Sequence, residues 1–323
     1  MEGMMDVLGI DISKQKFQVA LLLSSGKWKQ HTFQNSNPGF AELLEWLAKQ
    51  YATDVHACME STGGYGDALA TFLCDRGNAV SVVNPSRIKA FAGSELVRTK
   101  TDASDASVIA RFCASQSPEL WQPPSELERA LQSLVRRRTD LLAAHSQEIL
   151  RLQAPTVSAQ VRPSLEHHIA FLDQEIVDVE AQIQELIDDD PDLRRRRDLL
   201  VSIPGIAERS AASILGEMPG IEQFRDGKAV AAYAGLCPRH NQSGVFTGRS
   251  RLSKIGNARL RHALFFPAMT AMRLNPALKA FANRLRARGK KPILIVAAVM
   301  RRLLVLAYGV LKSGRAFHLA ETP

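Results

Sequence analysis

The sequence predicts an α/β domain followed by an all-α region, and three observations lead to this fold class. Strand-like and helix-like stretches alternate over about the first 115 residues, as in sheets covered by helices. Residues 125–200 contain no glycine and space their apolar residues by three and four, which is typical of long helices. The last third is rich in Leu, Ala, Val and Phe, so it has a core to bury and is expected to fold rather than form a disordered tail.

In the first region, three strands open the chain and helix-linked strands follow, which indicates a mixed sheet with helices on it. Strands are expected at 7–13, 17–23, 29–35, 55–60 and 79–84. Helices are expected at 39–50, at 66–77 and from Asp102 onward.

The middle region is expected to form two long helices, over 127–152 and 169–187, paired as a coiled-coil-like hairpin. Pro155 and Pro163 are interpreted as the break between them, and the run DDDPDLRRRR as the far end. From residue 200 onward the pattern is mostly helical, with a Gly-containing polar loop near 237–250. We therefore expect three domains, at 1–122, 123–199 and 200–323.

Charge divides the chain unevenly, although the net charge is only +8. Residues 1–226 carry 23 Lys and Arg against 32 Asp and Glu, a net of −9, whereas residues 227–320 carry 18 Lys and Arg and no acid. Folded surfaces normally mix both signs, and this stretch has no acid of its own for pairing. A polyanion is the natural partner, and nucleic acid is the commonest one.

Other classes of protein are disfavoured. No apolar run is judged long enough to cross a bilayer, and an acid stands near the N-terminus where a signal peptide carries basic residues, so we expect a cytoplasmic protein without a membrane partner. The cysteines form no CxxC pair and lie in apolar surroundings, which favours buried free thiols over zinc ligands or disulfides. They are Cys58, Cys74, Cys113 and Cys237.

Four carboxylates stand at positions that suggest a metal site. Asp11 ends the first strand and Glu60 ends the strand VHACME, while Asp102 and Asp105 lie three residues apart where a helix begins. Singly, each fits an ordinary role at a strand end or a helix cap. Converging in one crevice, the four would repel one another unless a divalent cation neutralised them, and all-oxygen ligation indicates Mg²⁺ or Mn²⁺. A competing interpretation of GIDISKQKFQVALL and STGGYG is the pair of phosphate loops of actin-like sugar kinases.

Two features of the last region suggest contacts with phosphate. The turn IPGIA, with Pro204 and Gly205, resembles a helix-hairpin-helix that binds phosphate through backbone N–H groups, or is a plain helix connection. Ser243 lies in the polar loop, where a serine is ordinarily a turn residue but where cations would also hold a phosphate for a nucleophile. The nearby cationic or titratable residues are Arg239, His240, Arg249, Arg251 and Lys254.

A family resemblance runs through nearly the whole chain. The order GIDISK, MESTGGY, VVNPSRIKAFAGSELVRTKTDASDASVIARF, SIPGI, AYAGLCPRHNQSG and RLSKIGNARLRHAL resembles the DEDD transposases of the insertion-sequence 110 family, recombinases guided by a bridge RNA, with an Escherichia coli member as the expected nearest relative. The resemblance implies an RNase H/RuvC-like sheet domain, an acidic tetrad of Asp11, Glu60, Asp102 and Asp105, and Ser243 as nucleophile.

The same resemblance implies partners and a mechanism. Mg²⁺-dependent cleavage through a phosphoserine link would exchange donor and target DNA strands chosen by the RNA, and the helical hairpin would join subunits into dimers and tetramers. Two alternatives stay open, a hydrolytic Holliday-junction resolvase-like nuclease and a non-catalytic RNA-binding protein. The residues expected to bind nucleic acid are Arg98, Lys100, Pro204, Gly205, Arg239, Arg249, Arg251, Lys254, Arg259 and Arg261.

Overall fold

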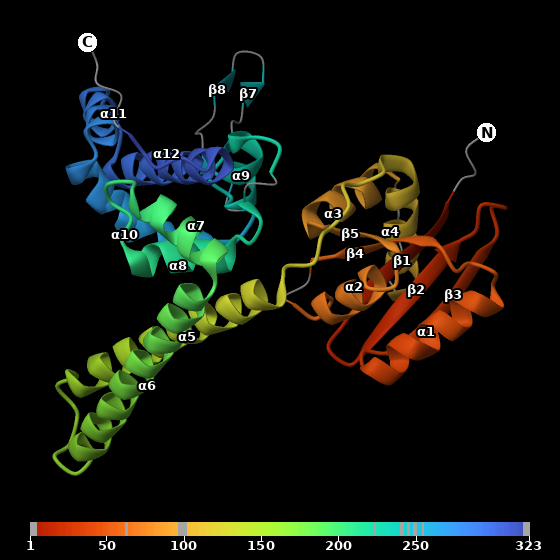
Figure 1. Cartoon of the computed structure of the whole chain (residues 1–323), viewed down its shortest axis with the longest axis horizontal. Helices are drawn as coiled ribbons and strands as arrows, with labels where there is room; N and C mark the ends of the chain where they lie inside the picture. Colours follow the sequence, from red (N-terminus) through yellow and green to blue (C-terminus); the bar gives the residue numbers. More distant parts are fainter. Residues whose placement is uncertain are drawn as a thin grey trace. The chain divides into compact units, whose positions relative to one another are not determined.

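The chain folds into two compact units, Met1–Pro123 and Pro124–Pro323 (Figure 1). The structure is a computed structural model that describes residues 5–61, 64–95, 102–221, 224–239, 242–243, 246–247, 251–253 and 255–318. Arg98, Lys100, His240, Arg249 and Lys254 lie outside these residues.

A five-stranded mixed sheet forms the centre of the first unit, in the order β3-β2-β1-β4-β5. Strands β1, β2 and β3 pair antiparallel, whereas β4 and β5 run parallel to β1. All five strands lie within two residues of the expected ranges. Their bounds are β1 Asp6–Ile12, β2 Lys16–Leu22, β3 Trp28–Gln34, β4 Val55–Glu60 and β5 Ala79–Val83.

Helices cover both faces of this sheet. One face buries Leu8 and Ile10 against Leu43 of α1 and Leu69 of α2, and the other packs against α3 and α4. Helix α3 was not expected, although Asn84 caps it and Pro85 opens it, which is a recognised start signal. The bounds are α1 Asn37–Lys49, α2 Asp67–Cys74, α3 Pro85–Ser94 and α4 Asp102–Gln116.

The second unit begins with the expected helical hairpin, formed by α5 (Glu126–Leu152) and α6 (Arg162–Asp189). Ion pairs join the two helices, including Arg138 Nε to Glu180 Oε1 at 2.6 Å. The hairpin ends where the run DDDPDLRRRR predicts, because α6 ends at Asp189 and α7 begins at Pro191. Pro155 lies in the break between the two hairpin helices, whereas Pro163 lies in the first turn of α6, because proline lacks only an N–H that a first turn does not use.

A bundle of six further helices shares one core with this hairpin. They are α7 Pro191–Val201, α8 Glu208–Glu217, α9 Gly227–Tyr233, α10 Ala258–Leu274, α11 Pro276–Ala287 and α12 Pro292–Ser313. Leu131 of α5 and Ile183 of α6 belong to the same buried cluster as Leu303 of α12. The hairpin is thus packed onto the bundle, and its functional separation from residues 200–323 stays a prediction.

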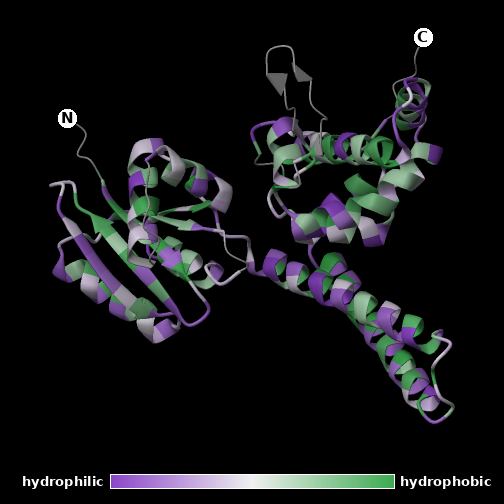
Figure 2. Cartoon of the chain, turned by 180° about the vertical axis from the view of Figure 1, so that it is seen from behind, coloured by the Kyte–Doolittle hydropathy of each residue, from purple (hydrophilic) through white to green (hydrophobic). Residues whose placement is uncertain are grey.

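Helix α12 corrects one expectation from the sequence. It is long and apolar enough to cross a membrane by length and composition, and Figure 2 shows its hydrophobic character along most of its length. Its Val299, Leu303, Leu304 and Ala307 are fully buried within the bundle. We therefore interpret α12 as the core helix of this unit.

Candidate active site

Asp11 and Glu60 lie at the ends of neighbouring parallel strands. The register pairs Ile10 of β1 with Met59 of β4, and Asp11 and Glu60 are the next residue on each strand. Adjacent strands lie about 5 Å apart. The backbone therefore places these two carboxylates beside each other at the carboxyl edge of the sheet, where open α/β sheets bind ligands.

Both carboxylates belong to the face of the sheet that α4 covers. A Cβ at Gly9 would lie 2.2 Å from the carbonyl oxygen of Ala106 and 2.4 Å from the amide nitrogen of Ala110, so the first strand touches α4 there. Because side chains alternate along a strand, Asp11 shares the face of Gly9. Cys58 belongs to the buried cluster on the α4 side, so Glu60, two residues on, shares that face as well.

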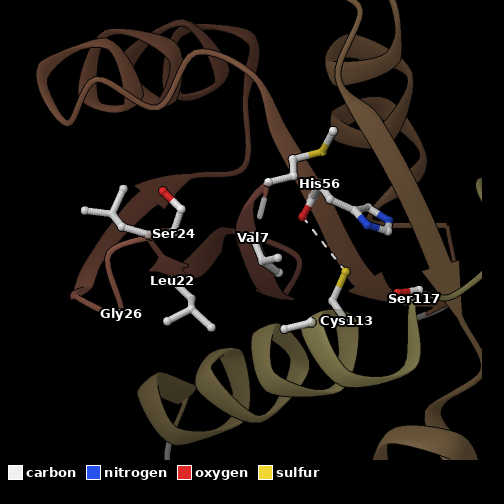
Figure 3. A pocket seen from close by; sticks show the side chains of 10 residues that line it. Val7, Leu22, Ser24, Gly26, His56, Cys113 and Ser117 are labelled. Atoms are coloured by element: carbon white, nitrogen blue, oxygen red, sulfur yellow. Dashed lines mark hydrogen bonds between the residues drawn. The ribbon is translucent and has the colours of Figure 1, made fainter. Parts of the chain in front are cut away.

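The direction of α4 brings its first turn to the same edge. Near its far end, Cys113 lies beside the start of β1 and β4, with its thiol 4.0 Å from the carbonyl oxygen of His56 (Figure 3). Ala106 and Ala110 meet Gly9, further along β1. Helix α4 therefore runs antiparallel to β1, and the turn with Asp102 and Asp105 lies toward the end with Asp11.

Figure 3 shows a pocket lined by Val7 and His56, near the starts of β1 and β4, and therefore at the opposite end of these strands from the acids. Its volume is about 230 Å³, and Val7, Leu22 and Cys113 contribute to its lining. Cys58 and Cys113 are both buried free thiols. A hydrogen bond with Cys113, together with burial, raises the pKa of Cys58 well above its ordinary value. The thiol form is therefore favoured at Cys58, which argues against a nucleophilic role.

The donor set at the sheet edge suits a hard divalent cation, because carboxylate oxygen is the ligand type that Mg²⁺ and Mn²⁺ prefer. Asp11, Glu60 and Asp105 are partly exposed, so none of the three is sealed inside the core. Among the residues whose side chains are described, no three or more His, Cys, Asp or Glu side chains lie close enough together to hold a metal ion. The Asp102 side chain lies outside that description, so the tetrad stays a prediction.

Ser243 belongs to a β-ribbon rather than to an irregular loop. Strand β7 (Gln242–Ser243) pairs with β8 (Phe246–Thr247), and β6 (Pro238–Arg239) pairs with β9 (Arg251–Leu252). We call residues 238–252 the serine arm. The register sets Arg239 opposite Arg251, and like charges opposite each other on paired strands are destabilising without an anion. The side chains of Arg239, Ser243 and Arg251 lie outside the description.

The base of the serine arm is tied to the bundle by backbone contacts. The amide of Ser253 donates to the carbonyl of Cys237 at 2.9 Å, and the amide of Asn257 donates to the carbonyl of Tyr233 at 2.7 Å. Gly256 has φ +134°, and a Cβ there would lie 2.2 Å from the Tyr233 oxygen. A larger residue at 256 would push the base of the arm away from α9.

Comparison with known proteins now adds to this geometry. Residues 8–156 match a transposase family of the DEDD type from IS110, and residues 197–283 match the IS116/IS110/IS902 family of transposases. The chain is 36% identical over 316 residues to the pilin gene-inverting protein of Moraxella bovis, covering 96% of this chain and 97% of that protein. The chain belongs to the IS110 family of transposases.

Other relatives are named after insertion elements. This transposase is 24% identical over 298 residues to the transposase for insertion sequence element IS1111A of Coxiella burnetii, which covers 83% of the chain and 78% of that protein. It is 29% identical over 154 residues to an IS110 protein of Streptomyces coelicolor, covering 48% and 37%. The expected closeness to an Escherichia coli member stays a prediction.

The transposase also contains a buried carboxylate that the sequence analysis missed. Glu217 ends α8 with 2% exposure, and its Oε1 accepts a hydrogen bond from Arg136 Nε at 3.1 Å. Its Oε2 accepts one from Asn257 Nδ2 at 3.0 Å, and the Tyr233 hydroxyl donates to its carbonyl oxygen at 3.3 Å. Glu217 therefore links α5, α8 and α9 to the residue that caps α10 just after the serine arm.

Replacing Glu217 by Ala is expected to lower the free energy of unfolding by about 2 to 4 kcal/mol, since Arg136 and Asn257 would lose their acceptor. Urea unfolding followed by circular dichroism measures the change. Asp140→Ala is the matched control, because Asp140 forms an exposed pair with Arg259 at 3.2 Å, worth less than about 1 kcal/mol. Equal, small losses in both variants would contradict the structural role of Glu217.

Two arginines expected to contact nucleic acid have structural roles in the bundle. Arg259 pairs with Asp140 of α5. The hairpin therefore supplies a carboxylate partner to the region of residues 227–320, which has no acid of its own for pairing. Arg261 Nη1 donates to the carbonyls of Ala234 at 3.0 Å and Gly256 at 3.2 Å, and burial lowers its pKa.

Packing explains why the turn after α7 contains Gly205. It has φ +111°, and a Cβ there would lie 2.6 Å from the Cα of Ala271 in α10. Glycine is thus required both by the left-handed backbone and by this close approach. A phosphate contact at Pro204 and Gly205, and the nucleic-acid roles of Arg259 and Arg261, stay predictions.

Proposed function

We propose that this transposase catalyses RNA-guided cleavage and exchange of DNA strands between donor and target, through a covalent phosphoserine link. Asp11, Glu60, Asp102 and Asp105 would hold Mg²⁺ or Mn²⁺, and Ser243 would be the nucleophile. The observation that carries the proposal is the antiparallel packing of α4 on β1. That packing brings the first turn of α4 toward the strand ends that carry Asp11 and Glu60.

In this proposal the oxygen of Ser243 attacks a DNA phosphorus. A phosphorus–oxygen bond to the serine forms, the bond to the 3′ oxygen breaks, and the serine proton ends on the released 3′-hydroxyl. When bound, the cation supplies charge stabilisation at the phosphate. The exchange conserves the phosphodiester bond energy, so the released 3′-hydroxyl can attack the serine link of a second strand without water or ATP.

The serine arm supports this role by its position and its charge. Its base is fixed by Asn257 and Gly256, and its strands set Arg239 opposite Arg251. A phosphate between these strands would relieve their repulsion. We further propose that the acids of one subunit act with the serine arm of another, so that cleavage requires an oligomer.

The helical hairpin is the proposed oligomerisation element, first as a dimer and then as a tetramer. It exposes apolar side chains on both helices, among them Leu150 at 67% and Phe171 at 53%. Exposed large apolar residues gathered on one element often mark a protein interface. The resolvase-like fold of the first unit is likewise a proposal, supported by its three antiparallel strands followed by helix-linked parallel ones.

Guide-RNA binding is assigned to the acid-free region, residues 227–320. Because many phosphate contacts release counterions, the affinity of the transposase for its guide RNA is expected to fall steeply with salt, with a log–log slope of several units. Filter binding between about 50 and 200 mM salt measures this slope. An affinity that does not change with salt would contradict the assignment of RNA binding to this region.

One gel separates the proposed function from its alternatives. End-labelled DNA from the ends of the transposase's own element, incubated with the protein, the element's non-coding RNA and Mg²⁺, is run under denaturing conditions. Protein-linked DNA supports the proposal, free cut ends indicate a hydrolytic resolvase-like nuclease, and uncut DNA with bound RNA indicates a non-catalytic RNA-binding protein. A recombinase of this kind would act in the cytoplasm, on the DNA of the nucleoid.

A further inference from the structure

A groove between α10 and α11 has no role in the proposed chemistry. Its volume is about 530 Å³, and it is lined by Met269, Met272, Arg273, Lys279, Asn283 and Arg286. Asn275 joins the two helices at its end, since it closes α10 and its side chain caps α11 by accepting from the amides of Ala277 and Leu278. Asn275 is fully buried, so the angle between the walls is fixed by packing.

Cations stand on both walls of this groove. Arg273 comes from α10, and Lys279 and Arg286 come from α11. Within the described part of the chain, none of the three forms an ion pair with a carboxylate, and residues 227–320 contain no acid at all. The groove thus calls for an occupant that brings several negative charges.

Apolar side chains lie beside these cations. Met269 and Met272 line the groove, and Phe266 is 67% exposed one turn earlier on α10. Residues 266, 269 and 273 are spaced by three and four, so they share one stripe of the helix. A polarizable thioether and an exposed aromatic ring beside cations are what a strand with free bases requires, because bases stack on the ring while phosphates meet the cations.

A double helix fits this surface poorly, since its bases are stacked inside and cannot reach an apolar floor. A single strand offers both unstacked bases for the apolar side chains and phosphates for the cations. Asn283, whose side chain lies in the groove beside Arg286, adds an amide that can pair with a 2′-hydroxyl, which RNA has and DNA lacks.

We propose that the α10–α11 groove binds a single-stranded segment of the guide RNA, with phosphates on Arg273, Lys279 and Arg286 and a base on Phe266 and the methionines. This rests on the proposed function, in which RNA is the partner of the transposase. It adds the place of contact and the single-stranded form of the ligand.

The test compares two triple variants that each remove three charges. The groove variant is Arg273→Gln/Lys279→Gln/Arg286→Gln, and the control is Arg288→Gln/Lys290→Gln/Lys291→Gln, exposed residues between α11 and α12 outside the lining. Fluorescence anisotropy with an unstructured, labelled uridine 12-mer measures affinity over a salt series. Melting curves check that both variants fold, as expected for exposed side chains.

The groove variant is expected to bind the 12-mer about tenfold or more weakly and to lose about two units of salt slope, from three lost phosphate contacts at roughly 0.7 each. The control is expected to change affinity less than about threefold. Phe266→Ala is expected to weaken binding about tenfold with an unchanged slope, since stacking releases no counterions.

Other outcomes would contradict the proposal that the groove binds single-stranded RNA. Equal losses of affinity in the two triple variants would show general electrostatic attraction only. If the groove variant weakened binding of a deoxythymidine 12-mer as much as binding of the uridine 12-mer, the groove would be reassigned to single-stranded DNA. If the protein bound a duplex more strongly than the 12-mer, and the groove variant weakened that binding to the same extent, a single-stranded site would be excluded. Wild-type protein that binds neither the 12-mer nor its guide RNA would instead refute the proposed function itself.

Discussion

Asp11→Asn and Asp105→Asn variants are each expected to lose DNA strand cleavage by about a thousandfold or more, because a metal-based stabilisation of the reacting phosphate is worth several kcal/mol. Folding is expected to survive. Removing one charge from a group of acids at one end of a sheet relieves repulsion. Denaturing gels of labelled DNA measure the first effect and thermal melts without metal measure the second.

Asp75→Asn is the matched control for these variants. Asp75 is an exposed acid at the C-terminal end of α2, and α2 packs on the opposite face of the sheet from α4. Its loss is expected to leave cleavage within about twofold of wild type, as surface substitutions away from a site usually do. A strongly lowered melting temperature for Asp105→Asn, with cleavage intact, would instead assign this acid to helix capping.

Ser243→Ala is expected to bind RNA and DNA as the wild type does but to yield neither protein-linked DNA nor strand exchange. Removing a hydroxyl takes away the attacking atom and changes little packing. Ser243→Cys is expected to retain a trace of activity through its thiol. Ser253→Ala, at the base of the same arm, is the control and is expected to cleave normally.

Mixing two inactive variants extends this test. If the acids and the serine act from different subunits, Ser243→Ala and Asp11→Asn proteins together are expected to regain part of the activity that each lacks alone. Normal cleavage with free ends by Ser243→Ala by itself would contradict the phosphoserine step and favour a hydrolytic nuclease.

The strands could be predicted because each shows a local pattern. Strand β4 ends at Glu60 and β1 ends one residue after Asp11, both acids singled out in the sequence. Helix α3 was missed, since Asn84-Pro85 can also open a loop and Gly93 lowers its helical signal. Pro163 is predicted to lie in the break between the hairpin helices but lies in the first turn of α6. Local signals do not separate a helix start from a helix end when proline is common to both.

The relations across long sequence distances could not be predicted from one chain. The antiparallel packing of α4 on β1 depends on Gly9 meeting Ala106 and Ala110, a contact that no local pattern encodes. Glu217 gave only the weak signal of an acid at the end of an apolar helix, and its partner Arg136 is 81 residues away. The acids themselves were found through spacing and resemblance, whereas the orientation that relates them comes from tertiary packing.

The most direct measurement is the identity of the residue joined to DNA. Wild-type protein is incubated with its RNA, Mg²⁺ and DNA of its element, the linked product is digested with protease and nuclease, and the nucleotide-bearing peptide is sequenced by mass spectrometry. We predict a single linked peptide with the phosphate on Ser243, absent when EDTA is added or when Asp11 is replaced by Asn. Efficient cleavage with no linked peptide, or a link to any other residue, would contradict the account.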